Sequence, residues 1–95
     1  MSRKLIVLAN RGRIREIAAA CNTPAIALIG STARGEDTAD SDCDFLADYT
    51  EDTSYFDVAR MTVQLGDLLG CEVDVVSRRA LPARMAHITA DAVPL

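Results

Sequence analysis

Aromatic residues and long apolar runs are scarce in this sequence. Its 95 residues include no tryptophan, two tyrosines, two phenylalanines and one histidine. The apolar run near the N-terminus, residues 5–9, is too short for the core of a signal peptide or for a membrane span. These absences argue against membrane attachment, and we expect a cytoplasmic protein.

Clusters of basic residues are missing too. No run of Lys or Arg exceeds two residues, and the formal net charge is −4. Because free-standing nucleic-acid-binding domains usually carry a basic patch, this charge argues against nucleic acid as a partner. It fits a basic protein partner, or a site that attracts cations.

Cysteine is limited to three residues, an odd number without the spacing of metal ligands. This indicates a reducing compartment. Cys21 and Cys71 stand in apolar contexts, and we expect both to be small core residues.

Three common site signatures are also absent. The sequence contains neither Gly-x4-Gly-Lys-Ser/Thr nor Gly-x-Gly-x-x-Gly, which excludes the P-loop and the dinucleotide-binding fingerprint. No serine–histidine–aspartate arrangement is recognisable. We expect the one histidine, His87, to be a surface or packing residue.

The residues that are present predict a layered α/β or α+β domain over 1–95. The apolar fraction is 49%, typical of one soluble domain, although a core this small leaves room for a partner or an oligomer. Periodicity and turn residues predict strands and helices in alternation, with the sheet covered by helices on at least one face. The expected helices are 2–21 (interrupted near 10–12), 31–35, 54–70 and 81–92, and the expected strands are 25–29, 43–49 and 71–76.

Particular residues support these boundaries. Ser31 is a candidate N-cap and Gly35 a candidate C-cap of the short helix. The long helix has apolar residues at spacings of three and four, which predict an apolar face: Phe56, Ala59, Val63, Leu65, Leu68 and Leu69.

A candidate phosphate site lies at Gly30 and Ser31. Gly30 follows an expected buried strand, where a residue without a side chain permits close approach of a ligand. Ser31 opens a helical turn, whose free N–H groups and positive dipole end suit a triphosphate. Gly-Ser is also a common turn pair, so the alternative is that Ser31 only caps the helix.

A candidate metal site lies at Asp42 and Asp44. Residues two apart in a strand project from one face, so the two carboxylates converge. Such oxygen ligands suit Mg²⁺ bound together with substrate phosphates, or two ions roughly 3.5–4 Å apart. The alternative is a pair of solvated aspartates at a strand edge.

Asp74 is the third candidate. It interrupts an apolar run that predicts a buried strand, where an unpaired carboxylate is costly, so a metal would compensate for it. If its strand lies beside the Asp42–Asp44 strand, Asp74 can complete the cluster. We assign Glu72 as a solvated neighbour and Asp37 and Asp40 to the preceding loop.

These motifs share one spacing. Gly30-Ser31, ten residues and Asp42-Cys43-Asp44 resemble the Gly-Ser-x10-Asp-x-Asp signature of the DNA polymerase beta-type nucleotidyltransferase superfamily. The sequence is most similar to its minimal nucleotidyltransferase (MNT) family, which often has Gly-Ser-x-Ala-Arg-Gly where this chain has Gly30-Ser-Thr-Ala-Arg-Gly35. Residues 73–76 and the tail 88–95 extend the similarity.

The resemblance implies the nucleotidyltransferase fold, a small mixed sheet of three or more strands with helices packed against it. It implies that Gly30 and Ser31 bind phosphates, and that Asp42 and Asp44 bind Mg²⁺, as two ions. Asp74 would complete the metal site and assist the nucleophile. Arg34 would either contact phosphate or pair with a nearby acid.

The resemblance also implies a function. Many MNT proteins are antitoxins of HEPN–MNT toxin–antitoxin pairs, and transfer AMP from ATP to a tyrosine of the HEPN ribonuclease. The alternative is a non-catalytic antitoxin that neutralises its toxin by binding. A third and less favoured hypothesis is transfer to a small molecule such as an aminoglycoside, because enzymes of that kind usually hold the acceptor with a second domain. No residue indicates which base is preferred.

Overall fold

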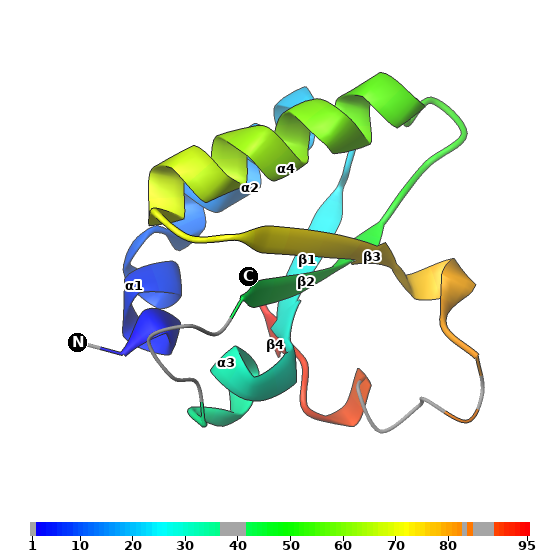
Figure 1. The fold of residues 1–95 in the computed structure, drawn as a ribbon. Helices are drawn as coiled ribbons and strands as arrows, with labels where there is room; N and C mark the ends of the chain where they lie inside the picture. The colour runs from blue at the N-terminus through cyan, green and yellow to red at the C-terminus, as the bar shows by residue number, and fades with distance from the viewer. Residues whose placement is uncertain (1, 37–41, 83, 85–88) are drawn as a thin grey trace.

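The computed structural model describes residues 2–36, 42–82, 84 and 89–95. Helices and strands alternate through most of this part of the chain (Figure 1). The helices are α1 (Arg3–Ala9), α2 (Arg11–Ala20), α3 (Gly30–Arg34), α4 (Tyr55–Leu69) and the short 3₁₀ helix η1 (Arg78–Ala80), and the strands are β1 (Ala25–Ile29), β2 (Cys43–Asp48), β3 (Val73–Ser77) and β4 (Val93–Pro94).

The strands form one mixed sheet in the order β3-β2-β1-β4. β1 is antiparallel to both β2 and β4, whereas β2 and β3 are parallel. This topology brings the end of β1 to the starts of β2 and β3. The expected mixed sheet of three or more strands is confirmed.

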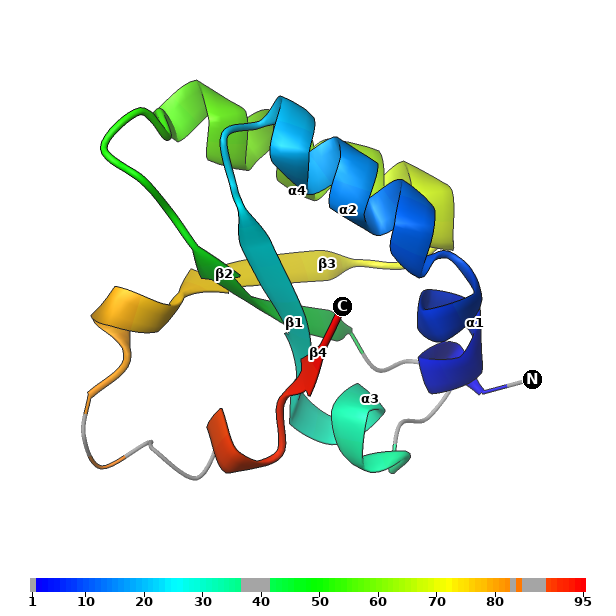
Figure 2. The same cartoon turned by 180° about the vertical axis from the view of Figure 1, so that it is seen from behind.

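Helices α2 and α4 lie side by side across one face of the sheet (Figures 1 and 2). The main apolar core lies between them and the strands; its fully buried members include Ile14, Leu28, Phe45, Met61 and Leu65. On the opposite face Ala27, Ile29 and Leu46 pack against Leu81 and Ala92. Both faces of the central strands are therefore covered, which explains why β1 is an unbroken apolar run.

The start of α4 is tied to the end of α2. Ser54 Oγ accepts a hydrogen bond from Asp57 N–H (3.0 Å), and Asp57 Oδ2 accepts one from Ser54 N–H (2.9 Å), which makes a capping box. Asn22 follows α2 in the left-handed region (φ 56°) and donates from Nδ2 to Asp57 Oδ2 (3.1 Å). The Ser54 backbone bond, followed by the Asn22 side-chain bond, holds the pKa of Asp57 below its ordinary value.

Several predicted boundaries are confirmed. The N-terminal helical region is interrupted at Asn10, the first strand spans Ala25–Ile29, and Gly35 ends α3 in the left-handed conformation (φ 73°). Gly70 likewise ends α4. Local signals sufficed here because cap and turn residues act on their immediate neighbours.

Two expectations about helices were wrong, the second of them in part. Ser31 is not an N-cap, because α3 begins at Gly30 with Ile29 in the cap position and no side-chain cap bond. The apolar face expected on α4 is confirmed only toward its C-terminal end, where Leu65 is fully buried and Leu68 and Leu69 pack against the core. Phe56 is 86% and Val63 63% exposed, and packing against α2 and β3 buries Met61 instead.

The expected helix over 81–92 was wrong at its described ends. Leu81 and Ala92 are not helical, and Val93 belongs to β4, a strand that the sequence analysis missed. Residues 83 and 85–88, including His87, lie outside the described residues, as do Asp37 and Asp40. Pairing with β1 recruits Val93 into the sheet, and a two-residue strand has no periodicity to recognise.

Within the part of the chain that the structure describes, no helix combines the length and apolar character needed to cross a bilayer.

Candidate active site

The candidate carboxylates meet where β1 ends and where β2 and β3 begin. Asp44 on β2 is the register partner of Asp74 on the parallel strand β3 and of Ile29 on β1. Neighbouring strands lie about 4.8 Å apart, so Asp44 and Asp74 are adjacent on the sheet. Asp42 stands one residue before β2 and is exposed. The structure thus brings the three predicted acids to one edge of the sheet.

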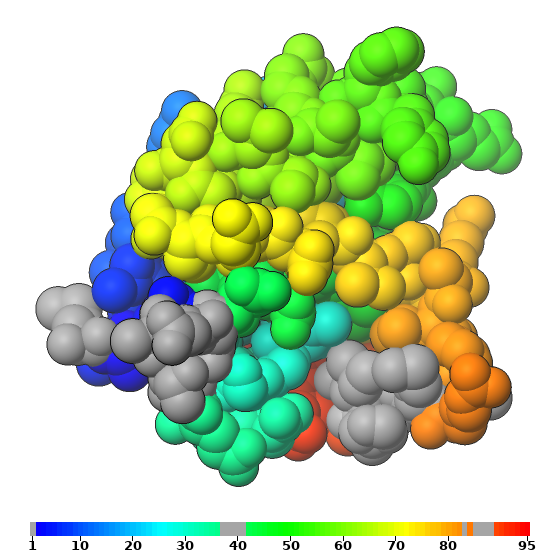
Figure 3. Space-filling view, in the orientation of Figure 1, coloured from blue at the N-terminus to red at the C-terminus, as the bar shows by residue number. Residues whose placement is uncertain are grey.

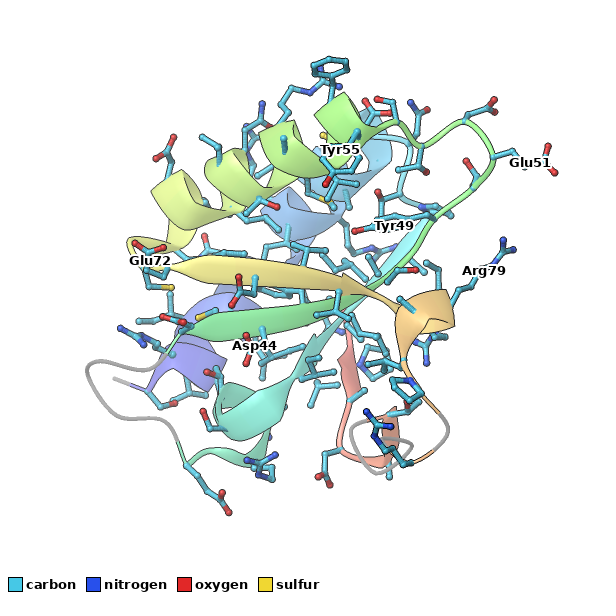
Figure 4. The ribbon with its side chains drawn as sticks, turned by 45° about the vertical axis from the view of Figure 1, so that its right-hand side comes forward. Asp44, Tyr49, Glu51, Tyr55, Glu72 and Arg79 are labelled. Carbon is cyan, nitrogen blue, oxygen red and sulfur yellow. The ribbon has the colours of Figure 1, made fainter. Side chains whose placement is uncertain are left out.

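Gly30 closes this site from the side of β1. A Cβ atom placed on Gly30 would lie 2.8 Å from Asp44 Oδ2, and φ is +76°, in the region that favours glycine. Figure 4 shows Asp44 directed from β2 toward α3. Glycine is therefore required here both for its backbone conformation and for the space taken by the Asp44 carboxylate.

A hydrogen bond connects α3 to the approach of β2. Thr32 Oγ1 donates to the Asp42 carbonyl oxygen (3.4 Å), and Thr32 is 1% exposed. This buried bond holds the backbone of Asp42 against the helix that carries Gly30 and Ser31. The sequence analysis missed Thr32, because a threonine in a small-residue motif carries no signal of its tertiary partner.

Arg34 pairs with a nearby acid, one of the two alternatives left open by the sequence. Its Nε lies 3.1 Å from Glu36 Oε2, and both side chains are largely exposed. An exposed pair of this kind contributes only about 0–1 kcal/mol. The guanidinium can therefore exchange this partner for another anion at little cost.

The charge at Asp44 is unfavourable in the protein alone. Burial raises the pKa of Asp44 above its ordinary value, and the negative charges of Asp74 and Asp42 raise it further. A divalent cation would relieve this repulsion, and the oxygen donors suit Mg²⁺. The residues therefore fit a magnesium site by their chemistry.

Asp42, Asp44 and Asp74 do not by themselves form a complete set of metal ligands in this structure. Among the described residues, no group of three or more His, Cys, Asp or Glu side chains is close enough to hold a metal ion. Mg²⁺ commonly binds one or two carboxylates, with phosphate oxygens and water as its other ligands. A nucleotide would have to supply the ligands that the protein lacks.

Asp74 differs from its prediction in one respect. It is exposed rather than buried, because β3 is an edge strand. Glu72 is exposed as predicted. In the space-filling view β2 and α3 reach the surface beneath β3, so the site opens to solvent at this end of the sheet (Figure 3).

A hollow of about 700 Å³ lies elsewhere, between α2, the start of β1 and the C-terminal residues. Its lining is mostly apolar, and none of the candidate site residues contributes to it. This hollow is therefore separate from the candidate active site.

A short helix directly after β1 and acidic residues on two adjacent strands define the nucleotidyltransferase class of α/β domain. The chain belongs to the nucleotidyltransferase domain family, whose model matches residues 13–93.

Relatives are found in Methanocaldococcus jannaschii. "Putative protein adenylyltransferase MJ0128" is 41% identical over 56 residues, covering 59% of this chain and 57% of the relative. MJ0126, which carries the same description, is 39% identical over 56 residues, with the same coverage. The matched part of the chain thus spans a little over half the length of these relatives.

Solved structures share this fold over most or all of the chain. One described as a "putative minimal nucleotidyltransferase" has a TM-score of 0.84 and 35% identity, covering 100% of this chain and 97% of its own. A toxin–antitoxin structure with AMP-PNP has a TM-score of 0.70 and 18% identity, covering 90% of this chain and 70% of that one. The second likeness concerns the fold alone.

Proposed function

We propose that this domain is an Mg²⁺-dependent nucleotidyltransferase that moves AMP from ATP to a tyrosine of a HEPN ribonuclease toxin, and so acts as its antitoxin. The observation that carries the proposal is the register of Asp44 with Asp74, with Gly30 packed against Asp44. Membership of the nucleotidyltransferase domain family supports the chemistry.

The names of similar proteins support the acceptor and the setting. Relatives described as protein adenylyltransferases suggest a protein as acceptor. A toxin–antitoxin protein with the same fold has been seen with AMP-PNP, an analogue of ATP. The net charge of −4 suits a basic partner surface.

Each site residue has a proposed role. Gly30 and Ser31 bind the triphosphate at the start of α3, while Asp42, Asp44 and Asp74 hold Mg²⁺, as two ions. When bound, Mg²⁺ neutralises phosphate charge and lowers the pKa of the attacking hydroxyl. Arg34 leaves Glu36 to contact a phosphate oxygen.

Asp74 acts on the acceptor, because it is exposed and lies beside Asp44 where β2 and β3 begin. It orients the tyrosine hydroxyl and takes its proton. The hydroxyl oxygen forms a bond to the α-phosphorus, the bond from that phosphorus to the bridging oxygen breaks, and pyrophosphate leaves. Positioning and charge neutralisation supply most of the rate.

The test is transfer of labelled AMP from ATP to a purified HEPN-type toxin protein. We expect Asp42→Asn, Asp44→Asn and Asp74→Asn each to reduce transfer at least about 10²-fold, since each removes a preorganised charge at the reacting centre. Asp48→Asn is the matched control. Asp48 lies on β2 as well, but it pairs with Arg78 at the other end of the strand (2.8 Å).

Unchanged transfer by the Asp44→Asn variant would end this assignment of the site. Neutralisation of the toxin by an Asp42/Asp44 double variant, at normal expression, would favour the non-catalytic antitoxin instead. The incomplete set of metal ligands in the described residues is the observation that keeps this alternative open. Parallel reactions with GTP would establish the base preference.

A further inference from the structure

Two cysteine side chains touch beside the candidate site. Cys71 Sγ donates a hydrogen bond to Cys43 Sγ across 3.1 Å, and the two residues are 28 positions apart in the sequence. Cys43 opens β2 and is 1% exposed, whereas Cys71 stands between α4 and β3 and is partly exposed. Cys71 packs against the main core, as the sequence analysis expected, but it keeps part of its surface accessible.

The backbone holds this pair in place. Cys43 N–H donates to the Glu72 carbonyl oxygen (2.9 Å), one residue from Cys71. Cys43 is also the register partner of Val73. A disulfide has a sulfur–sulfur distance of about 2.05 Å, so the sulfurs need to approach by only about 1 Å. Closing this gap requires the two side chains to move toward each other.

We propose that Cys43 and Cys71 form a redox-active dithiol, which a low-molecular-weight disulfide such as oxidised glutathione converts into a reversible intramolecular disulfide. This site is independent of the proposed transferase activity. The disulfide would attach Cys43, which lies between Asp42 and Asp44, covalently to the segment that connects α4 and β3.

The reaction balances as two thiol–disulfide exchanges. Cys71, the accessible thiol, loses its proton and attacks oxidised glutathione, which forms a mixed disulfide and releases one glutathione thiolate. Cys43 then loses its proton and attacks Cys71 Sγ, which releases the second glutathione. The two released glutathione thiolates take up the protons that Cys71 and Cys43 lost. The protein loses two electrons and two protons, and one glutathione disulfide gains them to become two thiols.

The experiment incubates the folded protein in glutathione buffers of graded ratio, blocks free thiols and measures intact mass. We expect the oxidised wild type to lose the mass of two hydrogen atoms and to retain one free thiol, Cys21. Dithiothreitol should restore three thiols. Cross-linking should also raise Tm by more than about 5 °C, because it constrains the unfolded chain.

Three variants separate this bond from other oxidation. Cys21→Ala is the matched control and should form the same bridge, since Cys21 is fully buried elsewhere in the core. Cys71→Ala should form none, and Cys43→Ala should carry one glutathione on Cys71. A wild type that stops at that mixed disulfide, or stays reduced in the most oxidising buffer, would overturn the proposal. A bridge that persists without Cys43 would do the same.

Discussion

At the scale of single residues, Gly30 is the most constrained position near the candidate site. Its backbone is in the left-handed region, and the Asp44 carboxylate lies so close that a Cβ atom on Gly30 would collide with it. Gly35 shares the left-handed backbone (φ +73°) but has open space around its Cβ position. The two glycines therefore allow the backbone cost to be separated from the contact with Asp44.

We predict that Gly30→Ala and Gly35→Ala each lower stability by about 1–2 kcal/mol, because a residue with a Cβ is strained in this conformation. Only Gly30→Ala should also reduce transfer, by about 10²-fold, since the added methyl displaces the Asp44 carboxylate. Urea unfolding and the AMP-transfer assay measure the two effects. Equal transfer by both variants would show that the contact with Asp44 is unimportant.

At the scale of elements, α4 shows how packing chooses between two faces of one helix. Its spacing of apolar residues is consistent with a core face through Phe56 and Val63, yet both point to solvent. Tyr55 at its start is 92% exposed. The capping box fixes where α4 begins, and its contact with β3 fixes its rotation.

The prediction for α4 compares two apolar residues two positions apart. Met61→Ala should cost about 2–5 kcal/mol, because Met61 is fully buried and its truncation leaves a cavity. Val63→Ala should change stability by less than about 0.5 kcal/mol, since Val63 is mostly exposed. Urea midpoints at constant slope are the measurement. Similar losses for both variants would contradict the packing of α4.

At the scale of the whole molecule, the candidate site lowers stability. Asp44 carries an elevated pKa, so the folded state binds its proton more tightly than the unfolded state does. Stability therefore falls as pH rises from the ordinary aspartate value near 3.8 through the raised pKa of Asp44, and the loss persists above it. Asp57, with a lowered pKa, acts in the opposite direction.

We predict that Asp44→Asn is more stable than the wild type at pH 7, because it removes the repelled charge. The advantage should shrink on acidification and disappear once Asp44 is protonated in both states. Thermal unfolding of both proteins at a series of pH values from 3 to 7 measures this. Because Asp57 is present in both proteins, its contribution cancels. A variant less stable than the wild type at pH 7 would refute the electrostatic account.

Local rules account for the parts that were predicted correctly. The alternation of strands and helices, the strand Ala25–Ile29 and the ends at Gly35 and Gly70 depend on residues near in sequence. The spacing of Gly30, Asp42 and Asp44 predicts one site; the structure places Gly30 against Asp44, and the role of these residues stays a prediction. The bond of Thr32 to Asp42 and the pair Cys43–Cys71 had no such signal.

The sequence by itself determined the order of elements, the acidic charge and the set of carboxylates, because these follow from residue type and local periodicity. Only the tertiary structure decided that β2 and β3 run parallel with Asp44 opposite Asp74, that α4 buries Met61 rather than Val63, and that Val93 joins the sheet. Strand register and helix rotation depend on contacts between distant segments, which the order of residues does not contain.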